Sequence, residues 1–340
     1  MMIEAKKMYL KPLLIDNLKL ETNILVAPLA GYTNLPTRLL LRKQGASLLY
    51  TEMVSAYGLN YNFEKSARLI SSIEEDGPLG IQLFGPDSKT ILEAFLKIKE
   101  FDYDLIDINC GCSVKKIIKS NSGAYLLKNP DEIYRIIMIL KNYTDKPITI
   151  KIRSGWDSNS INFLEVLDAA IDANVPLITI HPRTKSMLFN GSANWEHIKM
   201  MKEKSREKSN VLIIGNGDLF EFDDVVKMFE ITKCDGVMLA RGVIENPFLV
   251  EEVITKLNGV DYLPPTLEKR IEIVLNHSKG LIDIYGERRG MLEFRKYFSG
   301  YMKGYHDIKR VREKLNNILI YKDFENLLWK WRMESIHNTQ

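Results

Sequence analysis

Short apolar stretches alternate with amphipathic segments along the first three quarters of the chain. Eight of the apolar stretches are rich in Ile, Val and Leu, which predicts buried strands. They are Ile24–Ala27, Leu48–Thr51, Gly80–Phe84, Leu105–Asn109, Ile148–Ile152, Leu177–His181, Val211–Gly215 and Gly236–Ala240. The segments between them, such as "DSKTILEAFLKIKE", repeat apolar residues every three or four positions, which predicts helices.

Eight consecutive strand–helix units predict an α/β fold of the (β/α)8 TIM-barrel type. A doubly wound sheet is the competing architecture, and it usually carries a glycine-rich turn after its first strand. Here the first turn reads "APLAGYTN", without the G-x-G-x-x-G dinucleotide pattern. The chain also lacks the G-x-x-x-x-G-K-[ST] phosphate loop. The barrel is therefore the better prediction.

The strand pattern ends near residue 255, and a loop with Gly and Pro, "NGVDYLPPT", follows. From residue 266 onward the pattern is helical. We predict a barrel domain over 1–255, a linker over 256–265 and a C-terminal all-α helical domain over 266–335. No helix is left over as an obvious interface, so we expect a monomer.

The composition of the chain indicates in which cellular compartment the protein is located. No apolar run approaches the roughly 20 residues that a membrane span needs. The N-terminal "MMIEAKKMYLKP" has no apolar centre and does not resemble a secretory signal. Three cysteines are too few, and odd in number, for a disulfide framework. We therefore predict a cytoplasmic protein with no membrane association.

Charge is uneven although the net charge is only +3. Residues 261–340 hold 15 Lys and Arg against 11 Asp and Glu, and the excess is concentrated in 295–314. Such an asymmetry indicates a polyanionic partner for the C-terminal part. A solvated helix face is the alternative explanation.

Polar residues interrupt the ends of several predicted strands. In "ITIKIRSG", Thr149, Lys151 and Arg153 share one strand face. A lysine there is rarely buried unless it is paired, so it forms an internal ion pair or faces an anionic ligand. His181 ends "LITIH" and Gln82 lies in "GIQLF". An amide, a lysine and a histidine at one barrel mouth suit a flat heterocycle with alternating donors and acceptors.

The loops after the last two strands indicate a phosphate site. They read "IIGNGDLF" and "VMLARGVIENPF". In this architecture the loops after strands seven and eight usually bind phosphate. Gly217 and Gly242 would let backbone N–H groups approach an anion, and Arg241 could clamp it. Together the loops favour a phosphate-bearing cofactor over two ordinary tight turns.

Two of the three cysteines lie in "DINCGCSVKK". One C-x-C pair without a second pair does not fit a structural zinc site, so we expect no metal. Cys110 directly follows the strand and is expected to be a small apolar filler. Cys112 lies in the loop over the mouth, followed by Lys115 and Lys116. Their charge is expected to lower the thiol pKa, which suits an acid or a nucleophile, whereas an inert cysteine is the alternative.

These stretches together resemble the tRNA-dihydrouridine synthase family, of bacterial type. The matching segments, in order, are "APLAGYTNLPTRLL", "EMVSA", "DINCGCSVKK", "KIRSGWD", "HPRTK", "FNGSANW", "GNGD" and "ARGVIENPF". They span nearly the whole chain, and the combination is far more specific than any single segment. The C-terminal "FRKYFSGYMKG" at 294–304 is most similar to the B-type branch.

The resemblance implies FMN in the barrel mouth, NADPH or NADH as reductant, and a uridine in tRNA as substrate. It implies that Cys112 donates a proton to C5 of the uracil while a hydride from the flavin adds to C6. Asn109 would lie beside both the flavin and the substrate base, and Arg183 would hold flavin phosphate or substrate. Arg295 and Lys296 would contact the RNA. The implied cofactor contacts are Pro28, Leu29, Ala30, Gln82, Lys151, His181, Asn216, Gly217, Asp218, Ala240 and Arg241. Ser113, Pro182 and Ala240 depart from the usual family residues.

The C-terminal domain would hold the RNA backbone with basic residues, from Arg288 to Lys314. Tyr297, Phe298, Tyr301 and Tyr305 interleave with them and would either stack on bases or form the core of the domain. Two rival functions remain open from the sequence. One is an FMN-dependent barrel oxidoreductase of a free dihydropyrimidine, and the other is a non-catalytic RNA-binding factor.

Overall fold

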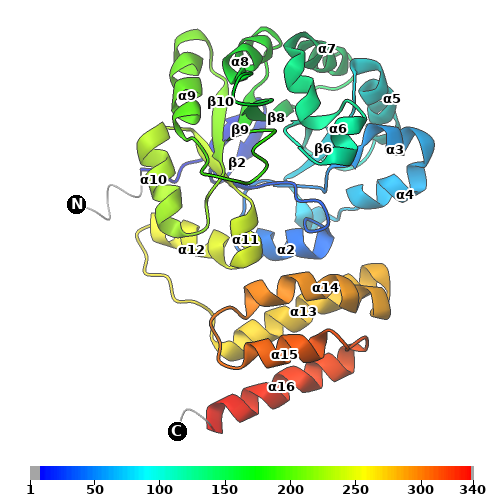
Figure 1. The fold of residues 1–340 in the computed structure, drawn as a ribbon, viewed down its shortest axis with the longest axis vertical. Coiled ribbons are helices and arrows are strands. Elements are labelled where there is room, and N and C mark those ends of the chain that lie inside the picture. Colours follow the sequence, from blue (N-terminus) through cyan, green and yellow to red (C-terminus); the bar gives the residue numbers. More distant parts are fainter. Residues whose placement is uncertain (1–7, 338–340) are drawn as a thin grey trace.

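The computed structural model describes residues 8–337, which form a barrel with a stack of helices below it (Figure 1). Residues 1–7, which begin the segment predicted not to be a secretory signal, lie outside the described residues. No helix within 8–337 is long and apolar enough to cross a membrane.

Eight parallel strands form the barrel, which confirms the predicted fold class. Their order around the sheet is β3-β11-β10-β9-β8-β7-β6-β4, and a parallel bridge between Leu25 and Leu48 joins the two ends. The strands are β3 (Ile24–Val26), β4 (Leu49–Tyr50), β6 (Leu79–Phe84), β7 (Leu105–Cys110), β8 (Ile148–Gly155), β9 (Leu177–Thr184), β10 (Leu212–Asn216) and β11 (Gly236–Leu239). Each overlaps a strand predicted from the sequence.

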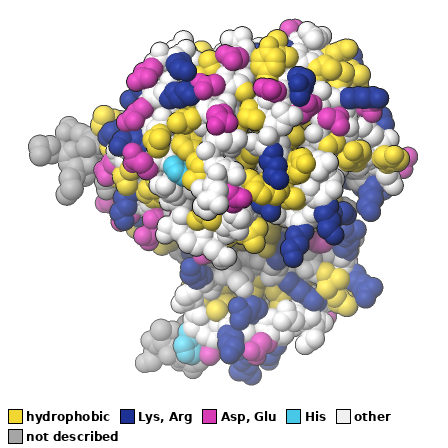
Figure 2. All heavy atoms as spheres, turned by 45° about the horizontal axis from the view of Figure 1, so that its top comes forward, with side chains coloured by type: hydrophobic (Ala, Val, Ile, Leu, Met, Phe, Trp, Pro, Cys, Tyr) yellow, Lys and Arg dark blue, Asp and Glu magenta, His cyan; other side chains and the backbone are white. Residues whose placement is uncertain are grey.

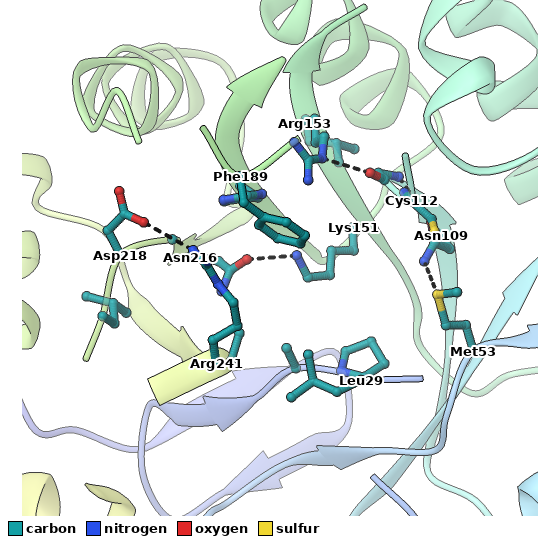
Figure 3. Close-up of a pocket in the computed structure, with 18 of the residues that line it drawn as sticks. Leu29, Met53, Asn109, Cys112, Lys151, Arg153, Phe189, Asn216, Asp218 and Arg241 are labelled. Carbon is teal, nitrogen blue, oxygen red and sulfur yellow. Dashed lines mark hydrogen bonds and ion pairs between the residues drawn. The ribbon is translucent and has the colours of Figure 1, made fainter. Parts of the chain in front are cut away.

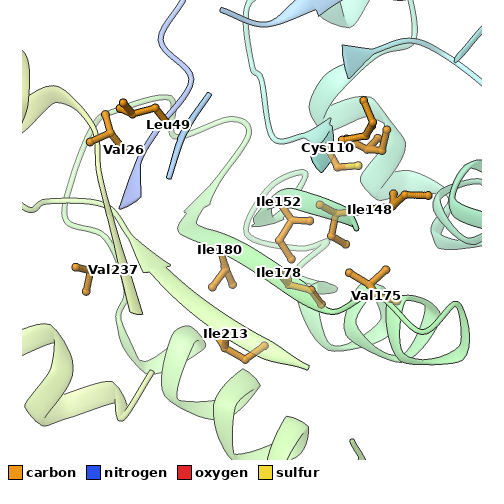
Figure 4. Close-up of a cluster of buried hydrophobic side chains, with 14 of the residues drawn as sticks. Val26, Leu49, Cys110, Ile148, Ile152, Val175, Ile178, Ile180, Ile213 and Val237 are labelled. Atoms are coloured by element: carbon orange, nitrogen blue, oxygen red, sulfur yellow. The ribbon is translucent and has the colours of Figure 1, made fainter. Parts of the chain in front are cut away.

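Helices cover the outside of the barrel. The longer ones are α2 (Leu35–Lys43), α5 (Ser88–Ile98), α7 (Pro130–Lys141), α8 (Phe163–Asp172), α9 (Glu196–Lys208), α10 (Phe222–Thr232) and α12 (Leu249–Leu257). Shorter turns are α3 (Ala56–Tyr61), α4 (Phe63–Ala67), α6 (Lys115–Lys119), α11 (Arg241–Glu245), η1 (Arg68–Ile70), η2 (Glu74–Asp76) and η3 (Gly123–Lys128). Outward-facing strand residues such as Ile152 and Ile180 pack against these helices in one continuous core (Figure 4). Cys110 is fully buried in this core, as predicted.

A hairpin that the sequence pattern does not predict contacts the interior of the barrel. It consists of β1 (Leu13–Ile15) and β2 (Leu18–Leu20), and its apolar residues pack against inward-facing residues such as Leu105 and Leu177. These contacts are near the strand starts and bury apolar surface at that end of the barrel. The strand β5 (Val54–Ser55), paired with β6, is not predicted by that pattern either.

The C-terminal helices are α13 (Leu267–Tyr285), α14 (Glu287–Tyr301), α15 (Ile308–Leu315) and α16 (Tyr321–His337). The predicted linker 256–265 overlaps the end of α12 and leads to α13. Tyr297, Phe298 and Tyr301 are buried in the core that these helices share. Of the two predicted roles, these three side chains therefore form the core of the domain and do not stack on bases. Tyr305 packs on Trp331 and is only partly buried.

Candidate active site at the open end of the barrel

Inward-facing residues become polar toward the end of each strand. On β7 the inward positions run from Leu105 through Asp107 to Asn109. Neighbouring strands place their polar residues in register with these, because Asp107 pairs with Thr149 and Asn109 with Lys151. Since the strands are parallel, all these side chains meet at one end of the barrel.

A pocket with a cavity volume of about 170 Å³ opens at this end (Figure 3). Twelve of the sequence-predicted site residues line it: Pro28, Leu29, Gln82, Asn109, Cys112, Lys151, His181, Asn216, Gly217, Asp218, Ala240 and Arg241. Arg183 is buried behind the pocket wall, and Ala30 lies exposed on the loop after β3. Arg295 and Lys296 lie on α14, outside this pocket.

A buried relay of polar side chains fixes the deepest part of the pocket. Asn109 Nδ2 donates to Gln82 Oε1 at 2.8 Å, and Gln82 Nε2 donates to Asp107 Oδ2 at 2.6 Å. Thr149 Oγ1 donates to the other oxygen of Asp107 at 2.6 Å. Burial raises the pKa of Asp107 to about 6, against the opposing hydrogen bonds. The relay sets which way the amides of Gln82 and Asn109 face.

The Cys112 loop is anchored to the same relay. Asn109 Oδ1 accepts from the backbone N–H of Cys112 at 2.8 Å and of Gly111 at 3.1 Å. Arg153 Nε donates to the Gly111 carbonyl at 2.9 Å. These contacts hold the thiol at the pocket wall, as Figure 3 shows.

The predicted lowering of the Cys112 pKa is wrong. Burial raises the pKa of the thiol, and Arg153 and Lys151 oppose that rise only in part. Lys115 and Lys116 lie exposed on α6 and are not among the causes of the shift. Cys112 is therefore held as a protonated thiol at neutral pH, which suits an acid better than a nucleophile.

Lys151 presents a cation to the pocket. Its Nζ donates to Asn216 Oδ1 at 2.9 Å, and Asn216 Nδ2 donates to the Met238 carbonyl at 2.7 Å. Burial, and after it the charge of Arg153, lowers the pKa of Lys151 to about 8. The ammonium is thus positioned by an amide and leaves donors for an anionic ligand.

A cluster of charged side chains lies at the β9–β10–β11 side of the mouth. Arg183 binds both oxygens of Asp218, at 2.8 and 2.7 Å, and Arg241 Nη2 lies 3.4 Å from Oδ1 of the same carboxylate. Although burial raises the pKa of Asp218, hydrogen bonds from Arg183 and Ala193 hold it below its usual value. Arg241 keeps one face over the ring of Phe189, 4.5 Å from its centre.

His181 is a neutral member of this cluster. Burial, and then the charges of Lys151, Arg153 and other nearby cations, lowers its pKa far below the ordinary value. Arg183 Nη1 lies 3.2 Å from His181 Nε2, so this nitrogen accepts and the proton is on Nδ1. A Cβ on Gly217, whose φ is +114°, would lie 2.6 Å from the imidazole, so only glycine fits there.

The family model described as "Dihydrouridine synthase (Dus)" matches residues 25–333 of the chain. The tRNA-dihydrouridine synthase B of Pasteurella multocida (strain Pm70) is 32% identical over 307 residues, which cover 89% of this chain and 91% of that protein. A probable tRNA-dihydrouridine synthase of Treponema pallidum (strain Nichols) is 33% identical, covering 86% and 88%.

The chain belongs to the dihydrouridine synthase family. This confirms the resemblance drawn from the motifs. A member of this family is a flavin-dependent oxidoreductase, which confirms the predicted enzyme class. Relatives named synthase B agree with the predicted B-type branch.

Solved structures match the fold of this family member. Histamine dehydrogenase from Rhizobium sp. 4-9 superposes with a TM-score of 0.57 at 14% identity, covering 81% of this chain and 51% of that chain. The structure of TcOYE with pHBA gives a TM-score of 0.53 at 13% identity, covering 76% and 95%. At such identities these matches support the barrel fold alone.

Several pocket residues of this dihydrouridine synthase were not identified from the sequence. Met53, Arg153 and Phe189 line the pocket, and Met53 Sδ lies 3.4 Å from Asn109 Nδ2. Strand alternation placed Arg153 on the face of Lys151, but no role in the site was assigned to it. Met53 and Phe189 lie on loops, where no periodicity places a side chain. Among the described residues no group of three or more His, Cys, Asp or Glu could hold a metal.

Proposed function

We propose that this chain is a tRNA-dihydrouridine synthase that reduces the C5–C6 bond of specific uridines in tRNA, with FMN as cofactor and NADPH or NADH as reductant. The observation that carries the proposal is Cys112, a protonated thiol on the wall of the pocket that holds the expected flavin contacts. The identified family and the names of its relatives support the substrate class.

The residues present fit FMN. The pocket offers paired amides, Gln82 and Asn109, for a heterocycle with alternating donors and acceptors. It offers the Lys151 ammonium for an anionic ring edge, and Arg241 beside the small residues Gly217 and Ala240 for a phosphate. Ala240 has a φ of −135°, so this departure from the family pattern keeps an ordinary backbone N–H.

The chain's own groups would divide the reaction as follows. FMN held by these residues would, once reduced, supply the hydride for C6 of the uracil. Cys112 Sγ–H donates its proton to C5, so that one hydride and one proton saturate the double bond. Lys151 stabilises negative charge that develops on the ring system beside it. Asn109 holds the Cys112 loop through its Oδ1 and keeps the thiol aimed into the pocket.

A uridine in folded tRNA has to leave its stack to reach this pocket. The RNA would be held by the basic helical domain, where several dark blue Lys and Arg side chains are exposed on the face seen in Figure 2. A groove between α11, α14 and α15 has cationic walls made by Lys296, Lys303, Lys309 and Arg312. Such a groove suits a phosphodiester backbone.

Arg295 is less accessible than the sequence indicated. Its Nη2 donates to the Ile318 carbonyl at 3.1 Å, and its Nε is buried. A contact of Arg295 with RNA stays a prediction, but a charge reversal there would also disturb the packing of the helices. The exposed groove lysines are therefore better probes of RNA binding.

Reversing two groove charges is expected to weaken RNA binding. Lys303→Glu with Lys309→Glu should lower tRNA affinity at least tenfold at low salt and flatten the salt dependence, because fewer counterions are released. FMN content should be unchanged. Fluorescence anisotropy across a salt series measures both quantities. Lys279→Glu, an exposed charge on α13 outside the groove, is the matched control, and an equal loss in that control would show a non-specific charge effect.

FMN affinity is expected to fall as pH rises through about 8. In the protein without FMN, Lys151 has a pKa of about 8, so its side chain is charged below this pH and neutral above it. An anionic cofactor binds the charged form better, so the dissociation constant should rise by up to about tenfold per pH unit above 8. Lys151→Met should bind FMN weakly at every pH, and its dissociation constant should not rise above pH 8. Titration of FMN itself is common to both proteins, and parallel profiles would rule out Lys151 as the cause.

The deciding experiment is nucleoside mass spectrometry on unmodified tRNA incubated with the protein, FMN and NADPH. Dihydrouridine is the expected product. A flavin-loaded protein that forms none, but whose flavin is reduced by free dihydroorotate, would instead be a small-molecule oxidoreductase. A protein that binds tRNA without flavin would be an RNA-binding factor.

Repeating the assay with NADH in place of NADPH identifies the reductant. Size-exclusion chromatography of the protein tests the expected monomer. We also infer a cytoplasmic location, where tRNA and reduced nicotinamides are available.

A further inference from the structure

Helix α14 contacts two walls of the cofactor pocket at once. Its C-terminal half lies against the loop that follows β3, residues 27–34, and against α11, which follows β11 (Figure 1). Ala27, Pro28 and Leu29 of the first loop and Ala240 and Arg241 before and in α11 line the pocket. A helix of the C-terminal domain therefore supports the segments that should touch the cofactor.

The hydroxyl of Tyr297 is the main polar link between α14 and the loop. It donates to the Tyr32 carbonyl at 2.8 Å and accepts from Asn34 Nδ2 at 2.9 Å. The rings of Tyr32 and Tyr297 meet edge to face, with centres 5.4 Å apart. Tyr297 is 3% exposed, so these hydrogen bonds are not exchanged with bulk water.

A buried network extends this link into α13. Thr37 Oγ1 lies 3.2 Å from both Tyr297 Oη and His277 Nε2, and His277 Nδ1 lies 2.7 Å from Tyr301 Oη. Thr37 Oγ1 also donates to Asn34 Oδ1, the group that caps α2. Every member is buried. A fully connected buried network of this kind favours one arrangement of the two domains.

The adjacent residue on α14 belongs to the basic groove. Lys296 lines the groove, and its Nζ lies 5.2 Å from the centre of the Tyr32 ring. It also pairs with Glu293 at 2.6 Å and would be the nearest group to a Cβ on Gly31. One helix turn thus faces the groove with Lys296 and the pocket loop with Tyr297.

We propose that α14 couples occupancy of the basic groove to the cofactor pocket, with Tyr297 as the positioning residue that acts through the loop after β3. The inference rests on the proposed function in that RNA is taken as the ligand of the groove. A phosphate bound at Lys296 fixes α14, and α14 then fixes the loop through Tyr297. The loop is then already ordered when FMN binds, so FMN binding costs less conformational entropy. RNA and FMN therefore tighten each other's binding by the same factor.

The test is FMN affinity of the full chain, measured by flavin fluorescence without reductant, in the presence and absence of unmodified tRNA transcript. In wild type, saturating tRNA is expected to tighten FMN binding about fivefold or more. Tyr297→Phe keeps the ring and removes the hydroxyl, and its tRNA effect should fall below twofold. Tyr301→Phe is the matched control: it removes a buried hydroxyl at the far end of the network, one bonded to His277 rather than to the loop, and leaves the hydrogen bonds of Tyr297 in place. It should keep most of the wild-type tRNA effect.

Each outcome of this experiment supports or overturns one part of the proposal. Equal tightening in wild type and Tyr297→Phe would overturn the role of Tyr297, and no tightening in wild type would overturn the coupling. Equal losses in Tyr297→Phe and Tyr301→Phe would reduce the effect to general destabilisation. If Tyr297→Phe does not fold, Thr37→Val cuts the network from the barrel side and is expected to show the same loss. Coupling without dihydrouridine formation would contradict the proposed function but not this inference.

Discussion

Cys112→Ala is expected to lower the rate of dihydrouridine formation by about 10²–10⁴-fold, the usual contribution of general acid catalysis. The thiol lies in the pocket with a raised pKa, so it carries the proton at neutral pH. Its loop is positioned by backbone hydrogen bonds to Asn109, which the substitution leaves in place. FMN content and tRNA affinity should therefore be unchanged, because alanine removes only the acid.

Single-turnover oxidation of the reduced enzyme by tRNA, followed at the flavin absorbance, measures this step directly. Cys110→Ala is the matched control, since it removes a thiol two residues away that packs in the barrel–helix core. It should retain turnover close to that of wild type. A Cys112→Ala protein that reacts as fast as the control would remove Cys112 from the mechanism and require another proton donor in the pocket.

Arg38→Met is expected to lower the free energy of unfolding by about 3–5 kcal/mol, the typical cost of leaving one buried charge unpaired. The guanidinium binds Asp76 through Nε at 2.9 Å and Nη2 at 2.7 Å, and both side chains are at most 1% exposed. Arg38 also donates to the carbonyls of Thr33 and Ser71, each at 2.7 Å. Methionine fills much of the volume but leaves the Asp76 carboxylate without its cation.

Urea unfolding of Arg38→Met, of Asp76→Leu and of the double variant forms a mutant cycle. The double variant should be more stable than Arg38→Met, because it removes the buried charge along with its partner. If the double variant loses the sum of the two single losses, the pair has no coupling, and the carbonyl contacts of Arg38 explain the effect. Thr33 lies in the loop after β3, so FMN affinity should also fall in Arg38→Met.

The barrel strands could be predicted because parallel strands buried on both faces form nearly continuous apolar runs. That signal is strong for β3, which reads Ile-Leu-Val, and for β10, which begins Leu-Ile-Ile. The hairpin β1–β2 has three residues in each strand, and β5 has two, so neither gives a pattern to detect. Their pairing follows from contacts distant in sequence.

The site could be predicted where a residue's position on a strand determines its direction. Lys151 and His181 follow from strand alternation, whereas Asn216 was expected only from the family resemblance. The burial of a side chain could not be predicted from the sequence in the same way. The pKa of Cys112 rises because surrounding atoms exclude water from the thiol, whereas its sequence neighbours Lys115 and Lys116 face solvent. Tyr297 likewise looks like an RNA contact in sequence, yet tertiary packing buries it.

The contact between α14 and α11 constrains any exchange of the C-terminal helices between relatives. A Cβ on Gly300 would lie 2.0 Å from the Ile244 carbonyl oxygen, so the two helices meet backbone to backbone there. A transplanted helical domain that brings a larger residue to this position would be wedged away from the barrel. Chimaeras built to change which uridine is reduced therefore need this glycine, and the hydroxyl of Tyr297 beside it, on the donor helix.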